Sequence, residues 1–384
     1  MTLVSPASGS TASAAGIPRV VIDLEKIRRI NSGLGRFSLH LGRGLLDHLQ
    51  GRIDPVLLLP AGGEAAFRPR EFTVLRARPW RKEFVQRRLR PLAARLPGRR
   101  RYDLWHMTNQ MSRYEPLDPR VPMILTIHDL TFLHEPARGG RHSRTARKLA
   151  DIQRRVDRAA AVVTDSRFVA DDIRRELRLG DRPLHVIPLG LAPPPPPASE
   201  RPGFLADDRP FLLTVGNALP HKNVHVLLDL VERLPDRRLV VAGNHATPYG
   251  DLLRQEIVER RLEGRVTVPG EVSDEIRQWL YERCEAFLFP SLSEGFGFPV
   301  LEALAAGRPV FVTRRTSLPE LVGEHGFYFD SFDPDAMAAV VADGLARFGA
   351  DVGFAAHGRA HAATFTWERT VSLYASLYAQ LAAG

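Results

Sequence analysis

The sequence contains a single cysteine, Cys284, among its 384 residues. One cysteine cannot form a disulfide within the chain, and no group of cysteines and histidines has the spacing of a zinc site. No apolar stretch approaches the length that a membrane-spanning helix needs. Residues 1–17 lack the basic start and continuous apolar core of a signal peptide, so we expect a disordered tail there. These absences argue against a disulfide-stabilised secreted domain and an integral membrane protein, and they favour the reducing cytoplasm.

The chain carries a net charge of +9, with 53 lysines and arginines against 44 acidic residues. An excess of this size points to a polyanionic partner, whether a nucleic acid, the anionic face of a membrane or a phosphorylated substrate. The rest of the composition is that of a soluble globular protein, with 44% hydrophobic and 25% charged residues. The length is sufficient for two α/β domains of ordinary size.

Much of the positive charge lies in residues 67–101, which hold thirteen basic residues and two glutamates. Between Trp80 and Leu96, apolar residues recur at helical spacing with basic residues between them, which predicts a basic amphipathic helix that Pro91 should kink. Its basic face could be merely solvated, or it could bind a membrane surface. The arginines expected at such a surface are Arg81, Arg87, Arg88 and Arg95. Nucleic-acid binding is less favoured, because no recognised nucleic-acid module accompanies the charge.

The most informative stretch runs from Ala286 to Val312 and reads AFLFPSLSEGFGFPVLEALAAGRPVFV. It begins with an apolar run typical of a buried strand in a parallel sheet. Gly295 and Gly297 then permit a tight loop, Pro299 suits the first position of a helix, and a second apolar run follows. A helix that begins beside glycines at the carboxyl end of a parallel strand points its N–H groups and positive dipole end at the ligand crevice. The pattern therefore predicts an anion site, most simply for a phosphate.

Two carboxylates, Glu294 and Glu302, lie eight residues apart in this unit. A carboxylate beside a phosphate site suits sugar hydroxyls, as the acidic residue of dinucleotide-binding folds suits a ribose. From the pattern alone, Glu302 could equally be a helix charge favoured by the dipole and Glu294 an exposed loop acid. However, EGFGFPVLEALAAGRPV resembles the EGFGLPxLEA signature of retaining glycosyltransferases of family 4, and this resemblance favours the functional interpretation.

The resemblance covers both halves of the chain and implies the α/β GT-B architecture, in which two Rossmann-like domains with parallel sheets face a deep cleft. The five consecutive prolines Pro193 to Pro197 form an extended spacer and mark the domain boundary. The predicted parts are the tail at 1–17, an acceptor-side domain at 18–192, a proline-rich linker at 193–203, a nucleotide-sugar domain at 204–365, and a helix at 366–384 that packs back on the first domain.

Three elements of the first half resemble parts of the same family. One is TDSRFVADDIRREL, which resembles a T-x-S-x-F-x-x-x-[DE]-[IL] pattern and in which Ser166 is expected to be a helix N-cap. The string GLGRF at residues 33–37 resembles a G-x-G-R-[YF] element near the donor phosphates and the acceptor, and implies that Gly35 contacts the donor. The string TIHDLTF places His128 at the carboxyl end of a strand, where ligand-contacting groups gather. It resembles the HDL element whose histidine contacts the donor hexose. Without that resemblance, a histidine bonded to backbone with Asp129 capping the next turn explains the string equally well.

In the second half, GNALPHKN resembles the G-R-x4-K pattern of the family. A lysine at this strand-to-helix junction can pair with a diphosphate, which is the expected role of Lys222. Asn217 stands where the family has arginine, and His221 could supply part of the missing positive charge. Val272 lies in a segment that resembles the frame of the nucleotide base. The full set predicted to bind the donor is Gly35, Asn217, His221, Lys222, Val272, Glu294, Gly295, Phe296, Gly297, Phe298, Pro299 and Glu302, and the predicted catalytic residues are Glu294, His128 and Lys222.

The resemblance implies transfer of a hexose from a nucleoside-diphosphate sugar to a glycan hydroxyl with retention at the anomeric carbon. GDP-mannose is the first candidate donor and a GDP- or dTDP-deoxyhexose the second. The expected acceptor is a lipid-linked glycan of lipopolysaccharide, O-antigen or exopolysaccharide synthesis at the cytoplasmic membrane face. No cofactor and no metal are expected, because lysine and backbone N–H groups can handle the phosphates. Asp333-Pro334-Asp335 matches a D-x-D metal motif, but we interpret Asp333 as a helix N-cap.

Three alternatives remain at this point. A sugar-nucleotide epimerase shares the fold, but it would consume the donor without an acceptor. A glycoside synthase of the same family would release a soluble product. A basic nucleic-acid-binding protein would explain the charge but not the EGFGFP string. The sequence does not name the acceptor, the linkage, the base or the oligomeric state.

Overall fold

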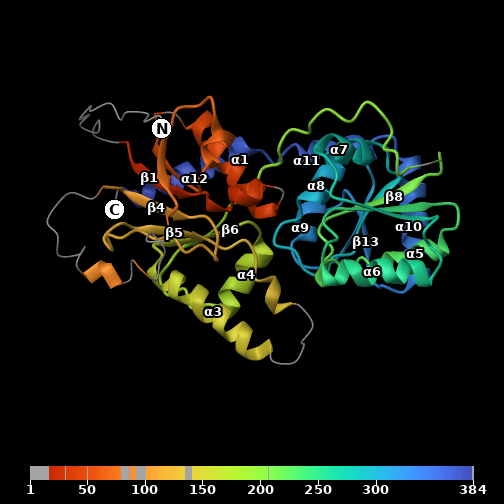
Figure 1. Ribbon diagram of the computed structural model, residues 1–384, viewed down its shortest axis with the longest axis horizontal. Helices are drawn as coiled ribbons and strands as arrows, with labels where there is room; N and C mark the ends of the chain where they lie inside the picture. Colours follow the sequence, from red (N-terminus) through yellow and green to blue (C-terminus); the bar gives the residue numbers. More distant parts are fainter. Residues whose placement is uncertain are drawn as a thin grey trace. The chain divides into compact units, whose positions relative to one another are not determined.

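The structure is a computed structural model that describes residues 17–30, 32–49, 51–78, 85, 88–91, 101–134, 141–205 and 207–382. These residues form two parallel sheets (Figure 1). The strand order is β3-β2-β1-β4-β5-β6-β7 in the first sheet and β10-β9-β8-β11-β12-β13 in the second. Neighbouring strands pair in parallel register, with helices in the connections. The predicted α/β fold class with two parallel sheets is confirmed.

The chain divides into two compact units. The first contains the described residues up to Thr126, residues 158–161 and the chain from Val371 onward. The second contains residues 127–157 and 162–370. The domain boundaries drawn from the sequence stay predictions.

The strands of the first sheet are short, with three to six residues each. They are β1 (Arg19–Asp23), β2 (Asp54–Leu59), β3 (Thr73–Arg76), β4 (Leu104–Met107), β5 (Met123–Thr126), β6 (Ala161–Thr164) and β7 (Leu184–Val186). The helices that lie between these strands in the chain are α1 (Gly33–His48), α3 (Arg141–Arg158) and α4 (Arg167–Glu176). The sequence reading missed β3, because its four residues lie among arginines and only Leu75 is buried.

Strands and helices alternate along the chain in the second sheet. Its strands are β8 (Phe211–Val215), β9 (Arg238–Ala242), β10 (Val266–Gly270), β11 (Ala286–Phe289), β12 (Val310–Thr313) and β13 (Phe327–Phe329). Its helices are α5 (Val226–Arg233), α6 (Pro248–Glu259), α7 (Asp274–Arg283), α8 (Phe298–Ala305), α9 (Leu318–Val322), α10 (Pro334–Ala350) and α11 (Phe354–Ala362). The predicted N-cap role of Asp333 is confirmed, since its carboxylate accepts the Ala336 N–H at 2.9 Å.

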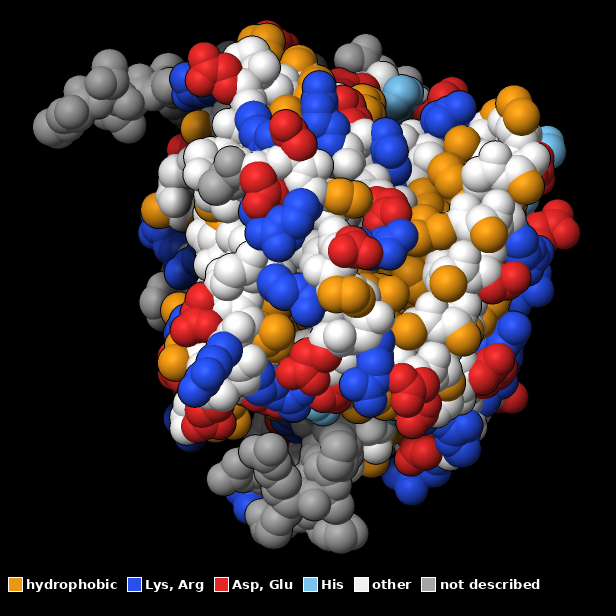
Figure 2. All heavy atoms as spheres, turned by 90° about the vertical axis from the view of Figure 1, so that its right-hand side faces the viewer, with side chains coloured by type: hydrophobic (Ala, Val, Ile, Leu, Met, Phe, Trp, Pro, Cys, Tyr) orange, Lys and Arg blue, Asp and Glu red, His pale blue; other side chains and the backbone are white. Residues whose placement is uncertain are grey.

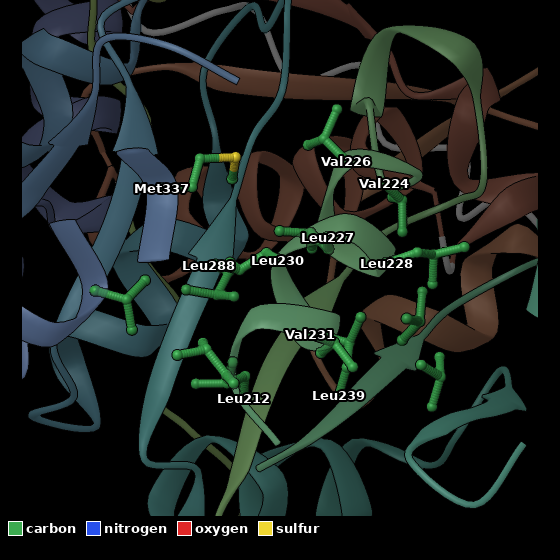
Figure 3. Packing of buried hydrophobic residues seen from close by; sticks show 14 of the residues in the cluster. Leu212, Val224, Val226, Leu227, Leu228, Leu230, Val231, Leu239, Leu288 and Met337 are labelled. Atoms are coloured by element: carbon green, nitrogen blue, oxygen red, sulfur yellow. The ribbon is translucent and has the colours of Figure 1, made fainter. Parts of the chain in front are cut away.

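One face of the second sheet packs against α5, α6 and α10. Alternate residues of each strand point to this face, as Leu288 of β11 and Leu212 of β8 do. They meet Leu227 and Leu230 of α5 and Met337 of α10 (Figure 3). Phe287, which precedes Leu288 in β11, points to the opposite face of the sheet. Its ring contacts that of Tyr281 of α7, with ring centroids 5.6 Å apart. The sheet is therefore covered on both faces, as a parallel sheet requires.

The last helix, α12 (Trp367–Ala382), carries buried tyrosines. The Tyr378 hydroxyl is 2.7 Å from Nδ1 of His106 in β4, and Nε2 of that histidine is 2.8 Å from the Thr126 hydroxyl. Tyr374 lies 3.3 Å from the same threonine oxygen. These hydrogen bonds fix α12 beside β4 and β5 within the first unit.

Two predicted segments lie mostly outside the described residues. The tail predicted at 1–17 is described only at Ile17. Of the predicted basic helix, the structure describes Val85 and residues 88–91, so Arg81, Arg87 and Arg95 lie outside it and Arg88 is exposed. Among the described residues, no helix combines the length and apolar character that crossing a membrane requires.

Candidate functional site

The loop between β11 and α8 is held by hydroxyl groups. The Ser317 hydroxyl oxygen lies 2.8 Å from the carbonyl oxygen of Phe296 and 3.2 Å from that of Glu294, so it can donate to either. Thr313, at the end of β12, donates to the carbonyl oxygen of Ser291 at 2.7 Å. All three hydroxyl-bearing side chains named here are buried. Because the loop carbonyls are satisfied by fixed donors, the backbone at residues 291–297 has a defined course.

The two loop glycines are required for different reasons. A Cβ on Gly295 would overlap the carbonyl oxygen of His128 and come within 2.9 Å of the Asp129 Cβ. Gly297 has φ +123°, a conformation that side chains rarely adopt. The sequence predicted a tight loop at these positions, and the structure places β11, the loop and α8 where that pattern expected them.

Helix α8 begins without a side-chain cap. Its N-cap residue is Gly297, which offers no side-chain acceptor, and Pro299 lies in the first two positions. Pro299 has no N–H and the Val300 N–H donates to the Gly297 carbonyl at 3.1 Å, so the N–H groups that precede Pro299 are the ones that can meet a ligand. The macrodipole favours an anion near them. This helix start is therefore chemically suited to a phosphate oxygen.

Lys222 and Glu294 form an ion pair beside this loop. Nζ of the lysine donates to Oε1 of the glutamate at 2.5 Å, and the Ser291 hydroxyl donates to the same oxygen at 2.6 Å. The ammonium also lies 5.0 Å from the ring centroid of Phe289, a cation–π contact. The lysine side chain is 17% and the glutamate side chain 11% exposed. Two residues predicted separately, one for phosphate and one for sugar, are brought together.

Glu302 lies in α8 and is bound from α7. The Tyr281 hydroxyl donates to its Oε2 at 2.8 Å, and Nε of Arg277 lies 3.7 Å from the same oxygen. Burial acts to lower the pKa of Arg277, but the charges of Glu302, Tyr281 and Asp274 outweigh it and raise the pKa. The carboxylate is therefore held in a fixed orientation rather than being a freely solvated helix charge.

His128 is buried and bonded to a carboxylate. Its Nδ1 lies 2.5 Å from Oδ2 of Asp165, and the histidine and aspartate side chains are 7% and 2% exposed. The neighbouring Ser166 caps α4 by accepting the Val169 N–H at 3.2 Å, as predicted, and its hydroxyl also donates to the Gly295 carbonyl at 3.2 Å. Asp129 accepts the Thr131 N–H at 3.1 Å, but the short helix that begins at Thr131 has Leu130 as its N-cap residue and no side-chain cap.

The other predicted donor residues are less constrained by the structure. Gly35 lies in the first turn of α1, where a Cβ would overlap the Arg29 carbonyl oxygen, so close backbone packing by itself requires glycine there. Asn217 is exposed, and Val272 is half-buried after β10. His221 contributes its carbonyl oxygen, which accepts the Leu292 N–H at 2.7 Å and lies 3.1 Å from the Ser291 hydroxyl oxygen. Their roles in ligand binding stay predictions.

Several residues that shape this site were not predicted from the sequence. Asp165 stands inside the TDSRF string, where only the serine received a role, and Tyr281 has no local motif. Glu320 was also overlooked: its two carboxylate oxygens accept the N–H groups of Arg167 and Phe168 at 2.8 and 2.6 Å, at the start of α4. For Asp165, its place directly after a buried strand was a usable signal, since such positions lie at the carboxyl edge of the sheet.

Comparison with known proteins places the chain in a family. A family model described as "Glycosyltransferase Family 4" matches residues 31–193, and one described as "Glycosyl transferases group 1" matches residues 198–347. The chain is 33% identical over 172 residues to O-antigen chain mannosyltransferase B of Escherichia coli, covering 44% of this chain and 45% of that protein. It is 32% identical over 212 residues to D-inositol 3-phosphate glycosyltransferase of Mycobacterium marinum, covering 52% of this chain and 42% of that protein. The matches thus span less than half the length of these relatives.

Solved structures agree on the fold. Sucrose-phosphate synthase from Thermosynechococcus elongatus superposes with a TM-score of 0.70 at 20% identity, over 95% of this chain and 99% of that one. HepE from Anabaena, in complex with UDP and glucose, superposes with a TM-score of 0.68 at 18% identity, over 94% and 99% of the two chains. Because the two family models follow one another along the chain and its two parallel sheets match these structures, we conclude that the chain belongs to the family 4 glycosyltransferases of the GT-B fold.

Proposed function

We propose that this protein is a retaining hexosyltransferase that moves a hexose from a nucleoside-diphosphate sugar to a glycan hydroxyl in the synthesis of a bacterial surface polysaccharide. The observation that carries the proposal is the Lys222–Glu294 ion pair beside the uncapped start of α8. It combines a cation and helix N–H groups for phosphate with a carboxylate for sugar hydroxyls. The alternative of a basic nucleic-acid-binding protein does not require this combination.

We assign the diphosphate of the donor to Lys222 and the N-terminus of α8. An ammonium has three N–H donors, and one of them is directed to Glu294. The remaining donors can bind diphosphate oxygens while the glutamate keeps the lysine in place. The N–H groups from Gly295 to Phe298 and the dipole of α8 add a second source of positive potential. Asn217 replaces the expected arginine, so Lys222 carries more of the charge neutralisation in this chain.

We assign the sugar hydroxyls of the donor mainly to the two carboxylates. Both hydrogen bonds to Glu294 end on Oε1, and no hydrogen bond from another described residue reaches Oε2. We assign Oε2 to a hydroxyl of the transferred hexose. Glu302, oriented by Tyr281, is assigned to the ribose hydroxyls, and His128 to a second hexose hydroxyl.

We explain retention of configuration at the anomeric carbon by attack of the acceptor oxygen on the face from which the leaving group departs. The acceptor oxygen bonds to the anomeric carbon as the bond to the diphosphate oxygen breaks, through an oxocarbenium-like transition state. The departing phosphate oxygen takes the acceptor's proton. Negative charge builds on the diphosphate in this step, and Lys222 with the α8 N–H groups is placed to stabilise it. Neither a cofactor nor a metal is part of this proposal.

The donor proposed first is GDP-mannose. Support comes from relatives named O-antigen chain mannosyltransferase, including RfbU of Salmonella typhimurium at 29% identity over 144 residues, which cover 36% of this chain and 41% of that protein. A GDP- or dTDP-deoxyhexose is the second candidate. The acceptor proposed is a lipid-linked glycan, which would place the protein at the inner face of the cytoplasmic membrane as a peripheral protein.

Charge distribution bears on the nucleic-acid alternative. On the face shown in Figure 2, acidic and basic side chains alternate with hydrophobic ones between them. Many described arginines are paired with acids, as Arg260 is with Asp229 and Glu256. The basic side chains therefore do not form one continuous surface on this face. Nucleic-acid binding favours such a continuous basic surface.

A thermal-shift panel with GDP, UDP, ADP and dTDP, without added metal, tests donor binding. One diphosphate at a hundred times its dissociation constant should stabilise the protein by about 2.7 kcal/mol. The effect should vanish in Glu302→Ala and persist in Glu259→Ala, a matched helical glutamate of α6 that accepts one side-chain hydrogen bond. If no diphosphate stabilises the wild type, the transferase proposal fails.

A second assay separates the enzyme classes. Incubation of GDP-mannose with the protein should release GDP only when a glycan acceptor is present. GDP release and free sugar without any acceptor would support the epimerase-like alternative instead. The anomeric configuration of the product, read from its one-bond C–H coupling by NMR, reports retention directly. Addition of EDTA should leave the rate unchanged.

A further inference from the structure

Two histidine–aspartate pairs with buried aspartates lie in the second unit. In one, Nδ1 of His128 is 2.5 Å from Asp165; in the other, Nε2 of His134 is 2.5 Å from Asp172. Both aspartates are almost fully buried, at 2% and 1% side-chain exposure. They differ in their surroundings: Asp172 is also paired with Arg175, whereas no cation other than the histidine is paired with Asp165 among the described residues.

The buried carboxyl group of Asp165 depends on its hydrogen bond to His128. Its second oxygen, Oδ1, is buried and has no hydrogen-bond partner in the described structure. Burial raises the pKa of the Asp165 carboxyl, opposed by the charge of His128 and the hydrogen bond to it. A buried carboxylate with one partner depends strongly on that partner. The histidine in turn has one ring nitrogen committed to a carboxylate.

The position of this pair links it to the loop described above. The backbone carbonyl of His128 is packed against Gly295, and Ser166, next to Asp165, donates to the Gly295 carbonyl. The imidazole is therefore held at both its backbone and its Nδ1 edge, next to the residue that follows Glu294. The His134–Asp172 pair has no contact with this loop that the described residues record, although its chemistry is the same.

We propose that Asp165 is a positioning residue that orients His128 and keeps the proton on Nδ1, so that Nε2 is a hydrogen-bond acceptor for a hydroxyl of the donor hexose. This proposal rests on the function proposed above. A neutral imidazole that donates from Nδ1 can only accept at Nε2. Asp165 does not touch the substrate; it acts through His128. The pair thereby selects a hexose that offers a hydroxyl proton at that position.

Nuclear magnetic resonance tests the tautomer without any activity assay. In protein labelled with 15N-histidine, long-range 1H–15N correlations should show His128 protonated on Nδ1, its signals being those that disappear in His128→Gln. Asp165→Asn should shift these signals toward the other tautomer, since an amide can donate to Nδ1. Unchanged His128 signals in Asp165→Asn would overturn the proposal. In a serine-protease triad the same change leaves the geometry intact and lowers kcat about 10⁴-fold through the wrong tautomer.

Kinetics supply a second readout. Asp165→Asn should lower kcat for hexose transfer by about 10- to 100-fold, the range seen when carboxylates that orient metal-bound histidines are removed. It should leave the dissociation constant of the free nucleoside diphosphate unchanged, because that ligand lacks the hexose. In a His128→Gln background, Asp165→Asn should have no further effect. A loss of diphosphate affinity equal to the loss of kcat would indicate a purely structural role and overturn the proposal.

Asp172→Asn is the matched control. It alters a histidine–aspartate pair whose aspartate is as buried as Asp165 and whose histidine is 28% exposed. It should shift the His134 signals while leaving transfer kinetics unchanged. A drop in kcat as large as that of Asp165→Asn would contradict a specific role for Asp165. The diphosphate thermal-shift panel keeps the two proposals apart: without a stabilising nucleotide the transferase proposal fails, whatever the NMR result for the pair.

Discussion

Lys222 and Glu294 lie 72 positions apart in the chain and are joined by a 2.5 Å hydrogen bond from Nζ to Oε1. The lysine follows β8 and the glutamate follows β11, and these two strands are neighbours in the second sheet. Each side chain fixes the other, with Ser291 as a second donor to the glutamate. The group proposed for the diphosphate and the group proposed for the hexose therefore act as one pair.

Substitution of this pair should be strongly non-additive. Lys222→Ala should lower kcat/KM by about a hundredfold, the usual cost of removing one donor to developing charge. Glu294→Gln should also impair transfer, and the double variant should lose much less than the product of the two single losses, because the residues are in contact. Steady-state kinetics of the three variants measure this. Lys148→Ala, which changes an exposed lysine of α3, is the control and should retain full activity. Independent, multiplicative losses would contradict a coupled pair.

Gly295→Ala should destabilise the protein and abolish diphosphate binding. The new Cβ would overlap the His128 carbonyl and crowd Asp129, and strain of this kind costs about 1–3 kcal/mol. Urea unfolding measures the stability and the thermal-shift panel the binding. The matched control is Gly349→Ala in α10, where nothing lies within 4 Å of the new Cβ. It should instead stabilise the helix by about 0.5–1 kcal/mol. Equal effects of the two substitutions would refute the packing explanation.

The buried carboxyl of Asp23 should make stability fall as the pH rises. Burial, opposed by hydrogen bonds from Ser112 and the Glu25 N–H, raises the pKa of Asp23 from 3.8 to about 6. Between these values the folded protein binds a proton that the unfolded chain has lost, so the free energy of unfolding decreases with pH. The difference corresponds to roughly 3 kcal/mol. Asp23→Asn removes this titration, so its stability relative to wild type should increase from pH 4 to pH 7.

A second carboxylate gives a control of opposite sign. Hydrogen bonds from Arg76 lower the pKa of Glu64 from 4.5 to about 2. Its stabilising contribution is complete above the unfolded value and is lost as the pH falls toward 2. Glu64→Gln should therefore differ from wild type by a constant amount between pH 5 and pH 7 in the same urea titrations. A flat difference for Asp23→Asn over pH 4–7 would show that Asp23 titrates normally.

The hydrogen bond between Tyr378 and His106 should anchor α12. Tyr378→Phe removes the hydrogen bond between the tyrosine hydroxyl and Nδ1 of a fully buried histidine, which costs about 1–3 kcal/mol. The free energy of urea unfolding should fall accordingly, while the affinity for the nucleoside diphosphate stays the same. Ser376→Ala removes an exposed hydroxyl of the same helix and should change stability little. Wild-type stability in Tyr378→Phe would show that this hydrogen bond contributes nothing to the docking of α12.

Membrane binding can be tested through the predicted basic helix. Charge reversal of Arg81, Arg87, Arg88 and Arg95 should weaken co-sedimentation with anionic liposomes and leave binding to neutral liposomes unchanged. A matched control reverses Arg233, Arg283, Arg314 and Arg347, whose side chains are 48–65% exposed in the second unit. It changes the net charge equally. Unchanged sedimentation of the first variant, or equal losses in both, would remove a specific membrane role for the helix.

Local features of the fold could be predicted from the sequence. The order strand, glycine loop, helix and strand from Ala286 to Val312 was predicted because each step depends on the backbone preferences of adjacent residues. The caps at Ser166 and Asp333 were predicted for the same reason. Short elements with weak periodicity were missed, as β3 was, because four residues among arginines carry little signal.

The candidate site was predicted in its members but not in its contacts. Glu294, Glu302, Lys222 and His128 were named from motifs, yet none of the hydrogen bonds that join them to their partners was predicted. Asp165 had no motif of its own, and Tyr281 gave no local signal at all. A lysine can pair with any carboxylate that the fold brings near it, and the chain holds 44 acidic residues. Sequence order does not restrict that choice.

The sequence by itself determined the two parallel sheets, the glycine loop before α8 and the residue types available for phosphate and sugar, because periodicity and backbone conformation are local properties. Only the tertiary structure decided that Lys222 meets Glu294, that Tyr281 holds Glu302 and that Asp165 holds His128. These contacts join residues 21 to 72 positions apart. They form because the packing of helices on parallel strands brings the carboxyl ends of separate strands to one edge, where burial makes each charged or polar group require a partner.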